Sequence, residues 1–167
     1  MGLFIIACYN LIEVTDVEIR QVPYTDYDLQ TLVQELDDFF LNAWGQQVAG
    51  RYQSLHQLSL MAYECVCYEK EPIGCGCLKH IDAQNVEIKR MYVRAKYRRQ
   101  GVATQILQHL ETVAINNGYR YCLLETGKDM QDNILFYEKC GYHLVDNFGD
   151  FIGDDICICM KKDLNSN

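Results

Sequence analysis

Several polar side chains that bind anions gather in one segment, residues 97–107, which reads YRRQGVATQIL. Arg98, Arg99 and Gln100 come directly before Gly101, and the residues after this glycine are spaced like one face of an amphipathic helix. The start of a helix carries a partial positive charge and unpaired backbone N–H groups, so cations are unfavourable there unless an anion also binds. The pattern therefore suggests a site for a phosphate group.

The small residues of this turn support the same interpretation. Gly101 allows the backbone to approach a ligand closely, Ala103 keeps the first helical turn narrow, and Arg98 and Arg99 add charge-assisted hydrogen bonds. A solvated basic turn explains the segment equally well when the segment is considered alone. The choice between the two depends on the elements around the turn.

A strand, a helix and a second strand enclose the turn. Residues 85–93 alternate like a strand, residues 101–117 carry an apolar stripe that ends at Gly118, and residues 119–126 form an apolar run. This order defines a βαβ unit, in which the two strands are parallel and the turn follows the carboxyl end of the first strand. An anion bound there meets the N-terminus of the helix.

The remaining pattern predicts an α/β (α+β) fold around this unit. Further strands are expected at 17–22, 60–68, 72–81, 142–146 and 155–161, and further helices at 25–40, 48–57 and 131–140. Short polar turns on either side of 72–81 indicate an antiparallel meander that includes 85–93. We therefore expect a mixed, mostly antiparallel sheet of six to seven strands, flanked by about four helices, in a single domain spanning residues 1–167.

The charge balance argues against two classes of partner. The formal net charge is −8 and the isoelectric point is about 4.9, so general attraction to nucleic acid or to anionic membranes is not expected. A local nucleic-acid patch is the alternative, and it would contain Arg90, Arg94, Lys96, Arg98 and Arg99. Because the chain has no RNA-binding motif with interleaved aromatic residues, we expect no nucleic-acid partner.

The nine cysteines include three C-x-C pairs, which are Cys65 with Cys67, Cys75 with Cys77, and Cys157 with Cys159. Zinc and redox motifs use C-x-x-C spacing, whereas residues i and i+2 of a strand share one face of a sheet. We interpret these cysteines as small buried hydrophobic residues, with no metal site, in a reducing cytoplasmic compartment.

The chain begins with an apolar run, MGLFIIACYNLI, at residues 1–12. It is too short to span a bilayer and lacks the basic start of a signal peptide, and Ile6 stands where myristoylation requires Ser or Thr. We interpret residues 1–16 as an apolar arm or an additional strand, and a membrane-associated tail is the alternative.

The run from Glu87 through VRAKYRRQGVA resembles motif A of the GNAT superfamily of N-acetyltransferases. Its Q/R-x-x-G-x-G/A signature is matched by Arg98, Gly101 and Ala103, and LFYEKCGY at residues 135–142 resembles the family's Y-x-x-x-G-F/Y element. The family's order of strand, turn, helix, strand and short helix is followed over residues 60–161. The resemblance implies a GNAT-like fold in which the two parallel strands splay to hold CoA, with acetyl-CoA as co-substrate.

The resemblance also implies how CoA is held. Its pyrophosphate would sit on the turn, near the Arg98 and Arg99 side chains and the backbone N–H groups of Arg99, Gln100, Gly101, Val102, Ala103 and Thr104. The pantetheine arm would pair with the backbone of Met91 and Val93, and an N–H near Met91 or Tyr92 would polarise the thioester carbonyl. Many relatives carry an asparagine where this chain has Met130, and Asn133 is the candidate replacement.

Two side chains are implied in proton transfer. Tyr137 matches the tyrosine that protonates the departing CoA thiolate, and its alternative role is core packing. An alkylamine with a pKa of about 10.4 is almost fully protonated at pH 7, so a base must assist its attack. Glu87 stands where some family members carry that base, acting directly or through water, although an ordinary strand carboxylate would also explain it.

The resemblance implies direct acetyl transfer to a primary amine of a small molecule or peptide, within a ternary complex and without a metal. Acidic residues near the expected acceptor cleft suit a cationic amine or simply reflect an acidic surface; they are Glu35, Asp37, Asp38, Asp146, Asp150, Asp154 and Asp155. The alternative function is a non-catalytic acyl-CoA-binding or sensory module of the same fold. The identity of the amine, the length of the acyl group and a homodimeric state are left open.

Overall fold

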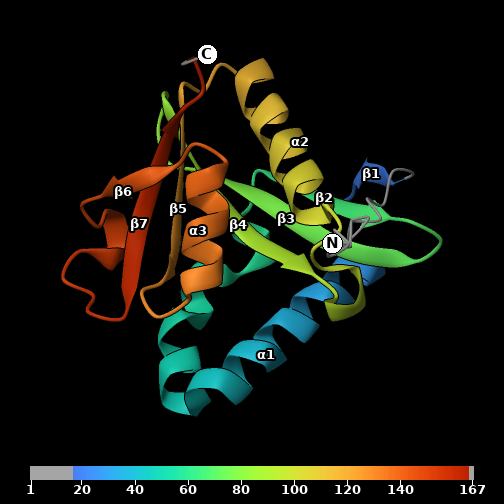
Figure 1. Ribbon diagram of the computed structural model, residues 1–167, viewed down its shortest axis with the longest axis horizontal. Helices are drawn as coiled ribbons and strands as arrows, with labels where there is room; N and C mark the ends of the chain where they lie inside the picture. Colours follow the sequence, from blue (N-terminus) through green and yellow to red (C-terminus); the bar gives the residue numbers. More distant parts are fainter. Residues whose placement is uncertain (1–16, 166–167) are drawn as a thin grey trace, which may run out of the picture.

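The computed structural model describes residues 17–165, so the expectations for the apolar arm at 1–16 lie outside the described residues. One seven-stranded sheet runs through the molecule in the order β1-β2-β3-β4-β5-β7-β6 (Figure 1). Its strands are β1 (Glu18–Gln21), β2 (Tyr63–Tyr68), β3 (Pro72–His80), β4 (Asn85–Val93), β5 (Tyr121–Gly127), β6 (His143–Val145) and β7 (Cys157–Asp163). The helices are α1 (Tyr27–Tyr52), α2 (Val102–Asn116) and α3 (Gln131–Lys139).

The strand pairing confirms the predicted meander and the predicted βαβ unit. Strands β2, β3 and β4 pair antiparallel in sequence order, whereas β4 and β5 pair parallel with α2 between them in the chain. The sheet is therefore mixed and mostly antiparallel, as expected. Strand β7 lies between β5 and β6 and pairs antiparallel with both.

Helices α1 and α2 pack on opposite faces of the sheet, as Figure 1 shows. The apolar stripe of α2 is fully buried, because Val102, Ile106, Leu110 and Ala114 are each 1% exposed or less. It packs in one core cluster with Cys65 and residues of α3, whereas Leu29, Leu32 and Val33 of α1 pack in a second cluster with Val66. Residues 65 and 66 alternate between the faces as the period of a strand requires.

The two helices expected before the meander are joined into one. Helix α1 runs from Tyr27 to Tyr52 and is kinked at Gly45, whose φ of 77° and ψ of 170° are not helical. The chain thus has three α-helices in its described part, where about four were expected, because the predicted break is only a kink. The N-cap is Asp26, whose Oδ1 accepts a hydrogen bond from the Leu29 N–H at 2.9 Å.

The C-x-C pairs behave as buried hydrophobic residues, which confirms that prediction. Each pair contributes both sulfur-bearing side chains to one core cluster, with Cys65 and Cys67 against α2, Cys75 and Cys77 against α1, and Cys157 and Cys159 near Tyr52. The eight cysteines that lie between residues 17 and 165 are free thiols. Within the same residues, no group of three His, Cys, Asp or Glu side chains is placed to hold a metal ion.

Candidate active site

Strands β4 and β5 pair over a short stretch and then separate. Their parallel pairing begins at Asn85 with Tyr121 and ends at Glu87 with Leu123, although β4 continues to Val93. In the described part of the chain, β4 residues 88–93 therefore have a strand partner on the β3 side alone. Apart from the Val93 carbonyl, which accepts a hydrogen bond from Arg98, the backbone groups on their other side are available to an extended ligand, as the splayed strands of the expected fold require.

A β-bulge lies in this open part of β4. Lys89 faces Cys77 and Tyr92 faces Cys75, so the single residue Gly76 of β3 lies opposite both Arg90 and Met91. Arg90 takes a φ of 55°, in the left-handed region that non-glycine residues rarely adopt. The bulge thereby re-aims consecutive side chains of β4 at the place where the strand separates from β5.

The turn between β4 and α2 presents a helix N-terminus. Gly101 is the N-cap residue with a φ of 81°, and it supplies no side-chain cap. The Gln105 N–H donates to the Gly101 carbonyl at 3.0 Å, and this is the first i to i−4 backbone bond of the helix. The N–H groups of residues 102–104 precede this bond, so they have no acceptor within the helix and can bind an anion.

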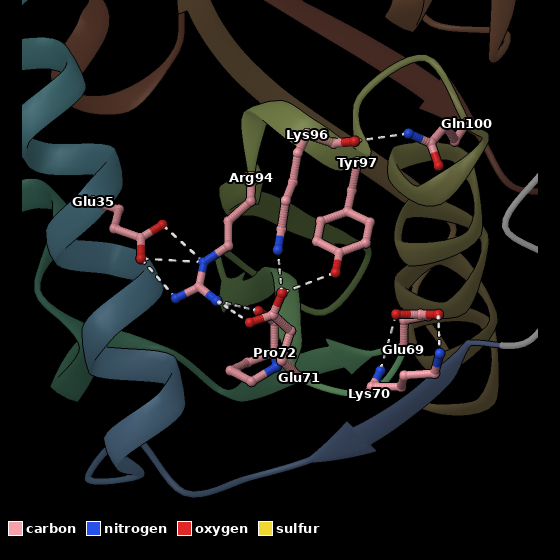
Figure 2. A network of polar contacts seen from close by, with 9 residues as sticks. All are labelled: Glu35, Glu69, Lys70, Glu71, Pro72, Arg94, Lys96, Tyr97 and Gln100. Carbon is pink, nitrogen blue, oxygen red and sulfur yellow. Dashed lines mark hydrogen bonds and ion pairs between the residues drawn. The ribbon is translucent and has the colours of Figure 1, made fainter.

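A network of ion pairs holds the segment that leads into this turn (Figure 2). Arg94 donates through Nε and Nη2 to Glu35 of α1 and through Nη1 to the Pro72 carbonyl, with the shortest bonds at 2.7 Å and 2.6 Å. Glu71 accepts hydrogen bonds from Lys96 and from the Tyr97 hydroxyl. The segment is thus fastened both to α1 and to the turn between β2 and β3.

Two cavities lie along the open part of β4. The smaller cavity, about 340 Å³, reaches the N-terminus of α2, and the larger cavity, about 650 Å³, lies between α1, β4, β5 and the start of β7. Both are lined by the same six residues, which are Leu36, Phe40, Met91, Met130, Asn133 and Tyr137. The cavities therefore meet along this shared wall.

The smaller cavity collects the residues predicted to hold CoA. Its wall contains every one of them except Gln100, namely Met91, Tyr92, Val93, Arg98, Arg99, Gly101, Val102, Ala103, Thr104 and Asn133. Gln100 instead donates from Nε2 to the Lys96 carbonyl at 2.8 Å, and this hydrogen bond stabilises the turn (Figure 2). Arg98 donates to the Val93 carbonyl at 2.8 Å, and Arg99 forms an exposed ion pair with Asp132 at 3.0 Å.

The basic residues considered as a nucleic-acid patch do not form one surface. Arg90 is buried, whereas Arg94 and Lys96 are bound to Glu35 and Glu71, respectively. Arg99 is exposed and pairs with Asp132, and Arg98 donates to the Val93 carbonyl.

The two residues predicted to transfer protons are placed differently. Tyr137 lies on the wall shared by both cavities and is 8% exposed, and burial raises the pKa of its hydroxyl well above the usual value. Glu87 lines neither cavity. It is 3% exposed, and its Oε1 accepts a hydrogen bond from Lys89 Nζ at 2.8 Å.

A chain of buried and partly buried ionisable groups connects Glu87 to the larger cavity. Lys89 Nζ lies 3.9 Å from Glu125 Oε2, and the same oxygen lies 3.8 Å from His56 Nε2. Burial lowers the pKa of His56 below its usual 6.5, although the nearby Glu125 acts in the opposite direction. His56 is therefore a neutral imidazole at pH 7, in the wall of the larger cavity.

Sequence reasoning did not single out His56, Lys89 or Arg90 for this cavity. His56 lies in an irregular segment between α1 and β2, where no periodicity indicates which way it points. Arg90 and Lys89 both line the cavity although they are consecutive, because the bulge interrupts strand alternation. Of the acidic residues expected near an acceptor, the cavity wall contains Asp37 and Asp38, and Glu35 is bound to Arg94.

Comparison with known proteins identifies relatives of the sequence. A model described as the acetyltransferase (GNAT) family matches residues 29–142. The "uncharacterized N-acetyltransferase YsnE" of Bacillus subtilis (strain 168) is 38% identical over 96 residues, which are 56% of this chain and 64% of that protein. The chain thus matches just under two thirds of the length of that relative. The "IAA acetyltransferase" of Azospirillum brasilense is 32% identical over 152 residues, which are 87% of this chain and 95% of that protein.

The fold is also shared with solved structures. A GNAT family acetyltransferase from Elizabethkingia anophelis, solved with acetyl-CoA bound, has a TM-score of 0.66 and 20% identity over 89% of this chain and 99% of that chain. In the described part of this chain, no helix is long and apolar enough to cross a membrane. The family model covers more than half of the sequence, and the splayed β4 and β5 with the turn at Gly101 match the expected fold. This chain belongs to the acetyltransferase (GNAT) family.

Proposed function

We propose that this protein transfers the acetyl group of acetyl-CoA to a primary amine of a small molecule or peptide, by direct attack within a ternary complex. The observation that carries the proposal is the meeting of the two cavities at Tyr137 and Met91. One cavity leads from this point to the anion-binding turn, and the other leads to a separate space large enough for an acceptor. Two substrates held in this way react without the entropic cost of a bimolecular encounter.

The smaller cavity has the chemistry to hold acetyl-CoA, which would supply an activated thioester. The N–H groups of residues 102–104 and the Arg98 and Arg99 side chains would hold its pyrophosphate. The open backbone of β4 at 88–93 would pair with its extended arm. A backbone N–H near Met91 or Tyr92 would polarise the thioester carbonyl and stabilise the negative charge that develops on its oxygen.

Tyr137 would act as the general acid. Its hydroxyl is protonated at pH 7 and can donate a hydrogen bond to the sulfur as the C–S bond breaks, while burial raises its pKa and makes it a weaker acid than a free phenol. No hydrogen bond from the Tyr137 hydroxyl is found among the described residues, which leaves its proton available. Asn133 and Met130 share the wall with it and would contact the arm of the donor.

The amine proton would leave through the chain of His56, Glu125, Lys89 and Glu87. His56 and Glu125 lie on the cavity wall and would meet the amine directly or through water. Glu87, the base expected from the sequence, is separated from the cavity and would act through Lys89. Replacement of His56 and of Glu87 by glutamine, in two separate variants, distinguishes the roles of these two residues. A change in the acid limb of the kcat/KM profile in His56→Gln but not in Glu87→Gln would assign the proton to His56, and the reverse result would assign it to Glu87.

Release of free thiol from acetyl-CoA tests the proposed function. Purified protein is first titrated with CoA by calorimetry and is then assayed with acetyl-CoA over a panel of primary amines, amino acids and short peptides. We expect CoA binding and amine-dependent thiol release. Binding without turnover for every acceptor would contradict the proposal and favour a non-catalytic acyl-CoA-binding or sensory module.

A further inference from the structure

Arg90 is a buried cation with unused hydrogen-bond donors in the wall of the larger cavity. Its side chain is 2% exposed, and its Nη2 donates to Asp37 Oδ1 at 2.6 Å and approaches the Val33 carbonyl at 3.5 Å. Its Nε and Nη1 are buried and have no hydrogen-bond partner among residues 17–165. A guanidinium group keeps its charge at any physiological pH, so these unpaired donors carry the full cost of desolvation.

Arg94, which lies close to Arg90 in the chain, has a hydrogen-bond acceptor for each of its side-chain nitrogens. It follows β4, four residues after Arg90, and it also reaches α1, yet all three of its nitrogens have acceptors on Glu35 or Pro72. The contrast indicates that Arg90 lacks a partner which the described part of the chain does not supply.

The backbone at Arg90 is also strained. Its φ of 55° is held by the bulge opposite Gly76, where an added Cβ would lie 2.8 Å from Leu110 Cδ1 and 2.9 Å from Met91 Sδ. Strained backbone conformations occur preferentially where a side chain must be aimed at a ligand. The bulge thus fixes both Arg90 and the neighbouring Met91, which lies on the wall shared by the two cavities.

The other charges of the cavity wall do not satisfy Arg90. Lys89 lies between Glu87 and Glu125, so this group keeps one net negative charge, but its carboxylates are directed at Lys89 and neither is hydrogen-bonded to Arg90. The carboxylate of Asp37 is 50% exposed, and it therefore neutralises the buried guanidinium less effectively than a desolvated carboxylate would. One further anionic acceptor is missing at Arg90.

We propose that the acceptor carries a carboxylate close to its amine, as an α-amino acid does, and that Arg90 binds this carboxylate. This inference rests on the proposed acetyl transfer. The amine must reach the shared wall at Met91, and Arg90 is the residue next to Met91. A substrate whose carboxylate lies close to its amine can therefore contact both places. Phe40 and Trp44, which stack with ring centroids 5.0 Å apart in the same cavity, offer an apolar surface to the remainder of the substrate.

Three amines that differ in the carboxylate alone test the proposal. They are L-leucine, L-leucinamide and 3-methylbutylamine, and kcat/KM for each is corrected for its fraction of neutral amine. Because the carboxylate adds charge-assisted hydrogen bonds, we expect L-leucine to be preferred over the other two by about tenfold to a hundredfold. The preference should fall to near onefold in Arg90→Gln and be partly retained in Arg90→Lys. Arg120→Gln, which removes an arginine from the exposed pair with Asp163 outside both cavities, should keep the wild-type preference.

A binding measurement keeps the test independent of how well the variants fold. The CoA complex of the wild-type protein is titrated with N-acetyl-L-leucine and with N-acetyl-L-leucinamide, and the acid should bind at least about tenfold more tightly. Turnover of all three amines without a preference for the carboxylate would overturn the role of Arg90 and leave acetyl transfer intact. CoA binding without turnover of any amine would overturn the proposed function and this inference with it.

Discussion

Two arginines on one stretch of chain show how differently the two ends of the site are built. All three guanidinium nitrogens of Arg94 donate hydrogen bonds to Glu35 or to the Pro72 carbonyl. These bonds hold the turn that faces the smaller cavity. Arg90 reaches the same helix, but its Nε and Nη1 have no hydrogen-bond partner among the residues that the structure describes. The arginine beside the smaller cavity thus has all its acceptors within the protein, whereas the arginine beside the larger cavity has two donors without a described acceptor.

Both ends nevertheless use the same backbone device. Among residues 17–165, the non-glycine residues with positive φ are Arg90, at 55°, and Arg99, at 62°. One lies in the bulge beside the larger cavity and the other lies in the turn beside the smaller cavity. The contrast between the ends therefore lies in the hydrogen bonds of the side chains rather than in the backbone.

The largest expected effect is at the donor end of the site, which is the smaller cavity proposed to hold acetyl-CoA. Gly101→Glu places a carboxylate where the pyrophosphate is expected and forces a side chain onto a φ of 81°, so CoA affinity should fall on the order of a hundredfold or more. Calorimetric titration with CoA measures this. Gly118→Glu is the matched control, because Gly118 has a φ of 83° and equally open surroundings at the other end of α2. Equal losses of CoA affinity in the two variants would show that strain, rather than anion binding, explains the effect.

Tyr137→Phe should mainly affect turnover. Removal of the proton donor is expected to lower kcat by about a hundredfold, with the Kd for CoA within about twofold of wild type. Steady-state kinetics and calorimetry measure the two quantities. Tyr119→Phe, which removes a hydroxyl bonded to His80 away from both cavities, should leave kcat unchanged. A wild-type kcat in Tyr137→Phe would leave core packing as the role of this residue.

Replacement of the two arginines by methionine tests the comparison in terms of stability. Arg94→Met removes several satisfied hydrogen bonds to a carboxylate and should lower the free energy of unfolding by about 1–3 kcal/mol. Arg90→Met removes a poorly compensated buried charge and leaves Asp37 half-exposed, so the loss should be under about 1 kcal/mol. Urea denaturation of both variants measures the difference. A larger loss in Arg90→Met would mean that Arg90 is a structural anchor like Arg94.

The smallest expected effect is a pH dependence of stability. Because burial lowers the pKa of His56 below 6.5, the unfolded chain binds a proton below that pH which the folded chain does not. Stability should therefore fall as the pH decreases from 7 to 5.5, by at most about 1.4 kcal/mol per pH unit for this group. The decrease should be smaller in His56→Gln, as measured by urea denaturation. Burial also lowers the pKa of His109, so His109→Gln should weaken the decrease without changing kcat. An identical pH dependence in wild type and His56→Gln would show that this imidazole titrates normally.

The donor end could be predicted from the sequence because its signals are local. The glycine, the basic residues before it and the helix after it are contiguous in one βαβ unit. The wall of the smaller cavity contains all but one of the residues predicted to hold CoA. Gln100 was the exception, since its side chain turns back to Lys96. The meander of β2, β3 and β4 and the parallel pair of β4 and β5 followed from periodicity and turn length, whereas the position of β7 between β5 and β6 was not predicted.

The acceptor end depends on features that no short pattern records. His56 and Glu125 are far apart in sequence and meet only because the kink at Gly45 and the irregular segment after α1 bring residues 53–58 over β5. The bulge at Arg90 breaks the alternation from which the direction of a strand side chain is inferred. Glu87 was expected as the base from the family resemblance, and the structure places it outside both cavities, hydrogen-bonded to Lys89.

The central claim is that an acetyl group passes between two ligands that meet at Tyr137. Simultaneous quantification of free CoA thiol and of the N-acetylated amine, in one reaction with acetyl-CoA and L-leucine, tests it most directly. We predict equal amounts of the two products at every time point, with both rates reduced about a hundredfold in Tyr137→Phe. Thiol release without the N-acetylated amine, or CoA binding without either product, would contradict acetyl transfer at this site.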